Sequence, residues 1–171
     1  MEIHDILRAH GVTRWHTVPL TRNQTLAEHL FNVTMIARDI CRRVDVDDAE
    51  VIKLALEHDL DEVVFGDIPS PAKSVYGMVE PYRGKNKPTC SQLAIDIVKL
   101  ADTVEAYWYI KQYGAGRLGT SARVYMKSAV DAMFNDPRYP PWLLSAVSDI
   151  LYLLDNGQFE GHGYVRNKVL E

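Results

Sequence analysis

Helical periodicity is the feature of this sequence that most limits the folds open to it. Apolar residues recur at steps of three and four along nearly every long segment, which places them on one side of an α-helix. The clearest run reaches from residue 25 to about residue 44 and contains Leu26, Leu30, Val33, Ile36, Ala37 and Ile40. No segment makes a convincing strand. The sequence therefore predicts an all-α fold, a compact bundle of six or seven helices.

Start and stop signals divide this pattern into separate helices. Thr25 and Glu28 have the spacing of a capping box, in which each residue bonds the backbone amide of the other, and Asp47 and Glu50 repeat it. Prolines after Gly66 lack amide donors and indicate a connecting elbow. We expect helices over about 25–44, 47–58, 91–113, 120–134 and 141–155, with the elbow over 66–71.

Length and composition indicate one domain that needs no covalent cross-links. The 171 residues contain no repeat or long linker, so we expect a single domain over 1–171. Cys41 and Cys90 lie far apart and match neither a metal motif nor a disulfide framework. The N-terminus is acidic, and no apolar run approaches the roughly 20 residues needed to span a bilayer. We therefore expect a cytoplasmic protein with no membrane partner.

The charge balance limits the possible partners. Nineteen Lys and Arg residues stand against 23 Asp and Glu residues, which gives a formal net charge of -4. Such a chain has no broad electrostatic attraction to the phosphate backbone of a nucleic acid. We therefore expect no nucleic-acid partner, and any phosphate group must be bound by local cations.

Four residues of metal-ligand type lie in otherwise apolar helical segments: His29, His58, Asp59 and Asp102. Taken singly, each has a structural explanation, because a helical histidine is often a core residue and a helical aspartate usually faces water. Together they supply two imidazole nitrogens and two carboxylate oxygens from three predicted helices. This set suits Zn, Mn, Co or Fe better than Ca or Mg alone.

The order His, His-Asp, Asp resembles the HD phosphohydrolase superfamily. The surrounding segments are more specific, and they comprise Arg14-Trp15, Arg22-Asn23, Glu28-His29, the stretch from His58 to Glu62, and the stretch from Gly66 to Lys73. Together they resemble the small bacterial 5'-deoxynucleotidases and the related virus-encoded dATP triphosphohydrolases. The resemblance covers about residues 14–113, and beyond residue 113 only a helical pattern remains.

The resemblance implies an HD-type fold in which His29, His58, Asp59 and Asp102 hold the metal ion. It also implies that Glu62 positions or deprotonates the attacking water, with Asp67 as a supporting catalytic carboxylate. The spacing of four residues from His58 agrees, because it places Glu62 on the same face of the predicted helix. The alternatives are a solvated acid at Glu62 and a cap or elbow residue at Asp67. For Glu28 we favour the capping box over catalysis.

Two residues near the start of the resemblance are candidates for substrate binding. Arg14 offers a fixed fork of donors to phosphate oxygens. The resemblance implies that Trp15 walls the sugar or base and that bulk there excludes a 2'-hydroxyl, although tryptophan is otherwise typical of a core. Further cations could reach the outer phosphates of a triphosphate, unless they form a solvated loop: Lys73, Arg83, Lys85 and Lys87.

The number of metal ions and the substrate can be predicted from the histidines and the spacing of the ligand segments. No histidine occurs between His58 and Asp102, unlike the binuclear members of the superfamily, so we expect one Zn, Co or Mn ion. A second ion, Mg, could arrive with a triphosphate. The ligand spacings are short, which resembles the viral enzymes. We therefore expect a dATP triphosphohydrolase that releases deoxynucleoside and tripolyphosphate, with a 5'-deoxynucleotidase acting on monophosphates as the alternative.

Two further classes of protein are possible. A regulatory HD module without activity would be expected to lose Glu62 or Arg14, and a purely structural bundle would not need Asp102 within an apolar helix. The large side chains at 107–110 exceed one buried stripe: Tyr107, Trp108, Tyr109 and Ile110. Since the resemblance also implies a homo-oligomer, we expect that the chain self-associates.

Overall fold

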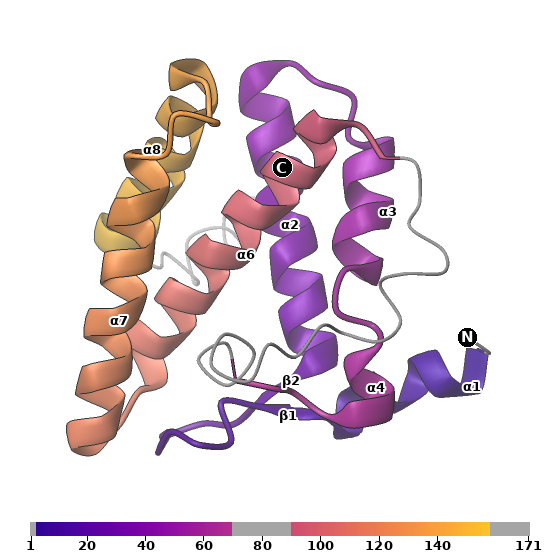
Figure 1. Ribbon diagram of the computed structural model, residues 1–171, viewed down its shortest axis with the longest axis vertical. Coiled ribbons are helices and arrows are strands. Elements are labelled where there is room, and N and C mark those ends of the chain that lie inside the picture. The colour runs from indigo at the N-terminus through magenta and orange to yellow at the C-terminus, as the bar shows by residue number, and fades with distance from the viewer. Residues whose placement is uncertain (1–2, 70–89, 158–171) are drawn as a thin grey trace, which may run out of the picture.

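The computed structural model describes residues 3–69 and 90–157, and this part of the chain is almost entirely helical (Figure 1). The elements are α1 (Ile3–Ile6), the 3-10 helix η1 (Leu7–Gly11), β1 (Thr13–Arg14), β2 (Gln24–Thr25), α2 (Leu26–Val44), α3 (Ala49–Glu57), α4 (Glu62–Phe65), α6 (Gln92–Tyr113), α7 (Gly116–Phe134) and α8 (Pro141–Asn156). The predicted all-α class is confirmed. No helix within the described ranges has both the length and the apolar character needed to cross a membrane.

Helix α2 is the central element of the core. It packs against α6, α3 and α8, and in Figure 1 α3 lies to its right, α8 lies to its left and α6 crosses it. Its apolar stripe, which includes Val33, Ala37 and Ile40, is fully buried in a cluster with residues of α3, α6 and α8. The predicted capping box is present, because Thr25 Oγ1 accepts from the Glu28 amide at 3.2 Å and Glu28 Oε2 accepts from the Thr25 amide at 3.0 Å. The start of α2 is therefore fixed by its own sequence.

Helix α3 begins and ends differently from the prediction. The second capping box does not form: Asp47 Oδ1 accepts from the Ala49 amide at 3.1 Å, whereas Glu50 accepts from the amide and hydroxyl of Ser91. Glu50 thus joins the start of α3 to the start of α6. The helix ends at Glu57, so residues 58 and 59 lie in the turn that follows it and not on the helix as predicted.

A short β-ribbon corrects the expectation that the chain has no strand. Strands β1 and β2 pair antiparallel, with Thr13 opposite Thr25 and Arg14 opposite Gln24. Two residues per strand are too few for any alternation of polar and apolar side chains to show in the sequence. The ribbon places Arg14 and Trp15 beside the first turn of α2.

The turn that joins α6 to α7 depends on glycines. Helix α6 ends before Gly114, as predicted, and a Cβ atom added to Gly114 would lie 2.6 Å from the carbonyl oxygen of Ile110. Helix α7 begins at Gly116, earlier than the predicted residue 120, and Gly116 has a φ of +60° that favours glycine. Together α7 and α8 cover the side of α6 that faces away from α3 (Figure 1).

Replacing the cap of α2 tests this account of the fold. We expect Thr25→Ala to lower the free energy of unfolding by about 1 kcal/mol, because the Glu28 amide loses its partner. Thr25→Ser keeps the hydroxyl and is the matched control. Urea denaturation of the three proteins measures the change, and an alanine variant as stable as the parent would contradict the role of the cap.

Candidate active site

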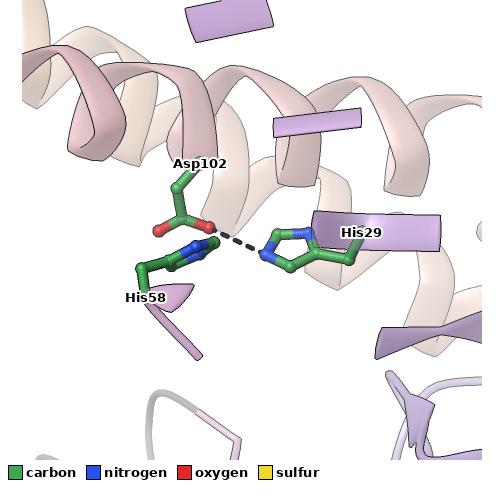
Figure 2. A group of neighbouring side chains, drawn as sticks. All are labelled: His29, His58 and Asp102. Atoms are coloured by element: carbon green, nitrogen blue, oxygen red, sulfur yellow. Dashed lines mark ion pairs between the residues drawn. The ribbon is translucent and has the colours of Figure 1, made fainter. Parts of the chain in front are cut away.

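Three residues from separate parts of the fold converge at the middle of the bundle. His29 lies on α2, His58 follows α3, and Asp102 lies on α6 (Figure 2). One ligand atom from each lies within 4.8 Å of the others. His29 Nε2 is 3.5 Å from Asp102 Oδ1, and the two imidazole rings are tilted with centroids 5.4 Å apart. The three side chains could therefore bind the same ion.

Asp59 faces the same point from the turn after α3. Its Oδ2 atom lies 3.7 Å from Nε2 of His29 and 3.5 Å from Nε2 of His58. All four predicted ligands thus come together, although two of them leave the helix that was expected to carry them. The turn is closed by backbone bonds from Leu60 to Glu57 and from Glu62 to Asp59. It is this turn, and not a helix ridge, that directs the adjacent His58 and Asp59 toward one point.

The hydrogen bonds of the two imidazoles fit a metal ion. His29 Nδ1 lies 2.8 Å from Glu105 Oε2, and His58 Nδ1 lies 2.8 Å from the carbonyl oxygen of Ala55. Because a carbonyl oxygen or an ionised carboxylate only accepts, each Nδ1 is the donor and each Nε2 keeps its lone pair. Both Nε2 atoms are buried and have no hydrogen-bond partner among the described residues. Two free nitrogens beside two carboxylates suit a divalent transition metal.

The surrounding charges keep both ligand carboxylates ionised. Burial opposes ionisation of Asp102, but the ammonium group of Lys99, whose Nζ lies 2.8 Å from Asp102 Oδ2, holds the pKa of Asp102 well below its usual range. Burial likewise opposes ionisation of Asp59, and the guanidinium of Arg14 lowers the pKa of Asp59. Both oxygens are therefore available to a cation at neutral pH.

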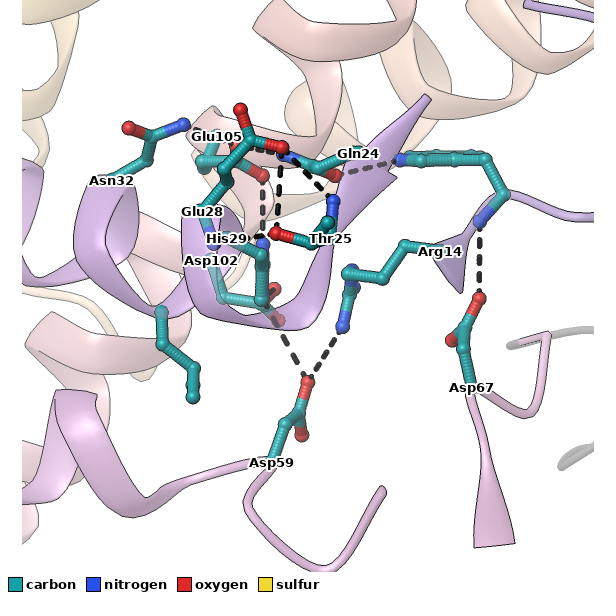
Figure 3. A network of polar contacts seen from close by, with 12 residues as sticks. Arg14, Gln24, Thr25, Glu28, His29, Asn32, Asp59, Asp67, Asp102 and Glu105 are labelled. Atoms are coloured by element: carbon teal, nitrogen blue, oxygen red, sulfur yellow. Dashed lines mark hydrogen bonds and ion pairs between the residues drawn. The ribbon is translucent and has the colours of Figure 1, made fainter. Parts of the chain in front are cut away.

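Arg14 lies at the edge of the ligand cluster. Its Nη1 atom donates to Asp59 Oδ2 at 3.1 Å and to Glu62 Oε2 at 3.2 Å (Figure 3 shows the Asp59 contact). Burial alone would disfavour the cation, but the carboxylates of Glu62 and Asp59 outweigh it and raise the pKa of Arg14. The Nε atom of Arg14 is buried and has no hydrogen-bond partner in the described ranges. The guanidinium is therefore held in place through Nη1.

Glu62 reaches the site by a route that the sequence did not indicate. It is the first residue of α4, so the predicted shared helix face with His58 does not exist. The turn over 58–61 nevertheless brings Glu62 to Arg14, and its side chain is 7% exposed. The carboxylate lies next to the cluster, as the spacing had predicted for a different reason. Its role toward water remains a prediction.

Trp15 and Asp67 form the side of the site next to the β-ribbon. Asp67 Oδ2 accepts from the backbone amide of Trp15 at 3.1 Å (Figure 3), so this elbow residue supports the backbone at Trp15. Trp15 is half-buried and has a φ of +61°. The remaining predicted substrate-binding residues lie outside the described part of the chain: Lys73, Arg83, Lys85 and Lys87.

Sequence reasoning missed two buried polar residues that contact this site. Gln24 and Glu105 are both fully buried, and Glu105 bonds His29. A signal for Glu105 was available, because the residue lies three positions after Asp102 in an apolar stretch of the same predicted helix. An acid there needs a partner inside the core. Gln24 precedes the capping box and gave no comparable signal.

A helical bundle that brings His, His-Asp and Asp to one point defines the HD class of phosphohydrolases. The family model described as 5'-deoxynucleotidase YfbR-like matches residues 3–83. A dATP triphosphohydrolase of Salmonella phage PMBT28 is 31% identical over 173 residues, covering 86% of this chain and 85% of that protein. The dATP triphosphohydrolase of Cyanophage S-2L is 30% identical over 127 residues, covering 67% and 73%.

Solved structures share the fold. The Cyanophage S-2L HD phosphohydrolase (DatZ), bound to dA and one catalytic Zn2+ ion, has a TM-score of 0.76 and 23% identity, covering 88% of this chain and 94% of that one. An HD-domain phosphohydrolase from Listeria innocua has a TM-score of 0.62 and 15% identity, covering 90% and 84%. The chain belongs to the HD phosphohydrolase family that includes the phage dATP triphosphohydrolases. It is a hydrolase that acts on phosphate esters, as its sequence had indicated.

Removing single ligands tests the metal centre directly. We expect His58→Ala and Asp102→Ala to lose bound metal, because each removes one of the few donors that converge on the site. His10→Ala is the control, since His10 is exposed and lies outside the cluster. Metal content after dialysis, measured by mass spectrometry, reports the result. Either ligand variant holding as much metal as the parent would remove that residue from the site.

Proposed function

We propose that this chain is a metal-dependent dATP triphosphohydrolase that converts dATP and water into deoxyadenosine and tripolyphosphate. The observation that carries the proposal is the pair of buried, unpartnered Nε2 atoms of His29 and His58. They face Asp59 and Asp102 and lie beside the Arg14 guanidinium. The names of the phage relatives, which match most of this chain, support the choice of substrate.

The four ligands would hold one divalent transition metal, Zn, Co or Mn. When bound, the ion lowers the pKa of a water molecule and stabilises negative charge on the phosphate. The donor set and the single catalytic Zn2+ of the cyanophage neighbour support one ion. A Mg ion that accompanies the triphosphate stays a prediction.

Arg14 and Glu62 supply the charges that the reaction needs. Arg14 is fixed by Asp59 and Glu62, and its guanidinium offers a hydrogen bond to an oxygen of the α-phosphate. Glu62 takes a proton from the water molecule while the oxygen of that water molecule attacks the α-phosphorus. The bond from phosphorus to the 5' oxygen breaks, and that oxygen takes up a proton as deoxyadenosine leaves. Tripolyphosphate is the other product.

Trp15 would lie against the sugar and exclude a 2'-hydroxyl. Its backbone is held by Asp67 and its indole by Gln24, so the ring cannot easily turn aside. Asp67 then acts by supporting Trp15, in addition to any catalytic part. Lys73, Arg83, Lys85 and Lys87 would hold the outer phosphates, which is a proposal from the sequence alone.

Self-association and a cytoplasmic location also remain proposals. The helix stretch that suggested a homo-oligomer is less available than expected, because Tyr109 and Ile110 are buried in the chain's own core. Large apolar side chains are instead exposed on α7 and α8, among them Leu118, Val124, Tyr125, Trp142 and Tyr152. These residues are a better basis for a homo-oligomer.

A 5'-deoxynucleotidase is the second candidate, and the family model that matches residues 3–83 favours it. Attack on the phosphorus next to the sugar would release orthophosphate from dAMP by the same groups. The two functions differ in the charge of the substrate.

Product analysis separates the two functions. We expect dATP to yield deoxyadenosine and tripolyphosphate in the presence of Zn, Co or Mn, with dAMP and ATP as poorer substrates. Ion chromatography that resolves tripolyphosphate from orthophosphate measures the outcome. Orthophosphate from dAMP as the main product would support the monophosphatase instead. If no metal restores any phosphate release, the enzymatic function itself is wrong.

Glu62 can be tested without disturbing the metal ligands. We expect Glu62→Ala to keep its metal and to lose activity by a factor of about 10² or more, because the proton acceptor is gone. Glu57→Gln is the control, since Glu57 is an exposed acid at the end of α3. Steady-state rates and metal content are measured on the same samples. Full activity in the alanine variant would exclude Glu62 from the mechanism.

A further inference from the structure

Glu105 is hydrogen-bonded to three side chains inside the core, one on β2 and two on α2. Its side chain lies on α6 and is 1% exposed. Oε2 is paired with Nδ1 of His29, whereas Oε1 accepts from Nε2 of Gln24 at 2.5 Å and from Nδ2 of Asn32 at 3.1 Å (Figure 3). A carboxylate buried among apolar residues is costly unless its oxygens are bonded. All three donors stabilise the buried carboxylate, and two of them, His29 and Gln24, also contact the candidate active site.

The bond to Gln24 continues to the wall of the sugar site. Gln24 Oε1 accepts from the indole Nε1 of Trp15 at 3.2 Å. Because Glu105 can only accept when ionised, it requires the amide of Gln24 to present its NH₂ group inward and its oxygen toward Trp15. The same requirement fixes the hydrogen of His29 on Nδ1 and leaves Nε2 for the metal. A single carboxylate therefore sets the orientation of the two side chains that it bonds, His29 and Gln24.

We propose that Glu105 is a positioning residue that links the metal ligand His29 to the sugar wall Trp15 through Gln24. The inference rests on the proposed function for the part played by Trp15, and it adds a specificity determinant to that function. Glu105 touches neither metal nor substrate, because Gln24 and His29 lie between. Its loss should weaken metal binding and deoxyribose selectivity together, whereas loss of Gln24 should weaken selectivity alone.

Three variants separate these effects. Glu105→Gln keeps the shape of the side chain but replaces one acceptor oxygen by an NH₂ group. This group would face at least one of the three donors, and His29 would be held less firmly. We therefore expect metal affinity to fall about tenfold or more. The preference for dATP over ATP, measured as a ratio of kcat/KM values, should fall about fivefold, which is the value of one hydrogen bond. Gln24→Met should lower only the preference. Asn32→Ala removes the third donor and should change neither quantity by more than about twofold.

Two measurements do not depend on turnover. Metal affinity is measured by competition with a chromophoric chelator, starting from metal-free protein. The tautomer of His29 is read from long-range ¹H–¹⁵N spectra of the metal-free parent, where we expect the hydrogen on Nδ1. A hydrogen on Nε2 with none on Nδ1 in the parent would overturn the proposal even if Glu105→Gln does not fold. Folding of each variant is checked by thermal unfolding.

The outcomes distinguish this inference from the proposed function. A parent that does not hydrolyse dATP contradicts the proposed function, while the metal affinities and the tautomer still test Glu105. An active parent whose Glu105→Gln variant keeps both metal affinity and selectivity overturns the positioning role. Equal loss of selectivity in the Asn32 and Gln24 variants would also overturn it, because a general packing defect would then explain the change.

Discussion

An imidazole nitrogen buried without a hydrogen-bond partner is unfavourable, and this fold places two of them close together. Much of the surrounding structure is explained by that arrangement. Glu105 and the carbonyl oxygen of Ala55 fix the opposite nitrogens of the two rings, so the free lone pairs are directed inward. Lys99 and Arg14 balance the acids that would otherwise repel one another. A cation at the centre would complete this set of contacts, and the helices that form the core are the frame that holds it.

The long helices and the shared location of the metal ligands could be predicted from the sequence. Helix α2 carries its own start signal, and the signal at Thr25 works because its partners lie within one turn. Histidine and aspartate are rare in apolar helical segments, so His29 and Asp102 could be recognised as candidate metal ligands from the sequence. The comparison with known proteins then confirmed the family that the motifs had indicated.

The failures of prediction share a physical cause. Rules based on neighbouring residues cannot include a contact with a residue that is distant in the sequence. Glu50 repeats a capping pattern but bonds Ser91 instead, because α6 begins beside it. The helical spacing of the sequence continues past Glu57, but the chain turns there. This turn brings the side chains of His58 and Asp59 to one point. The sequence marks Glu105 as an acid in an apolar helical stretch, but its partners Gln24 and Asn32 are known only from the fold. The substrate side, from the β-ribbon to the elbow, depends on contacts between segments about 50 residues apart.

The backbone at Trp15 has a consequence for how this scaffold could evolve. A φ of +61° is uncommon for residues other than glycine, asparagine and aspartate, and β-branched side chains adopt it only with strain. Replacement of Trp15 by valine or isoleucine would be disfavoured by this backbone conformation. The smaller residues that the peptide geometry accepts would leave the indole's volume empty. Under the role proposed for Trp15 as the wall of the sugar site, few substitutions at this position would lead to tolerance of ribonucleotides.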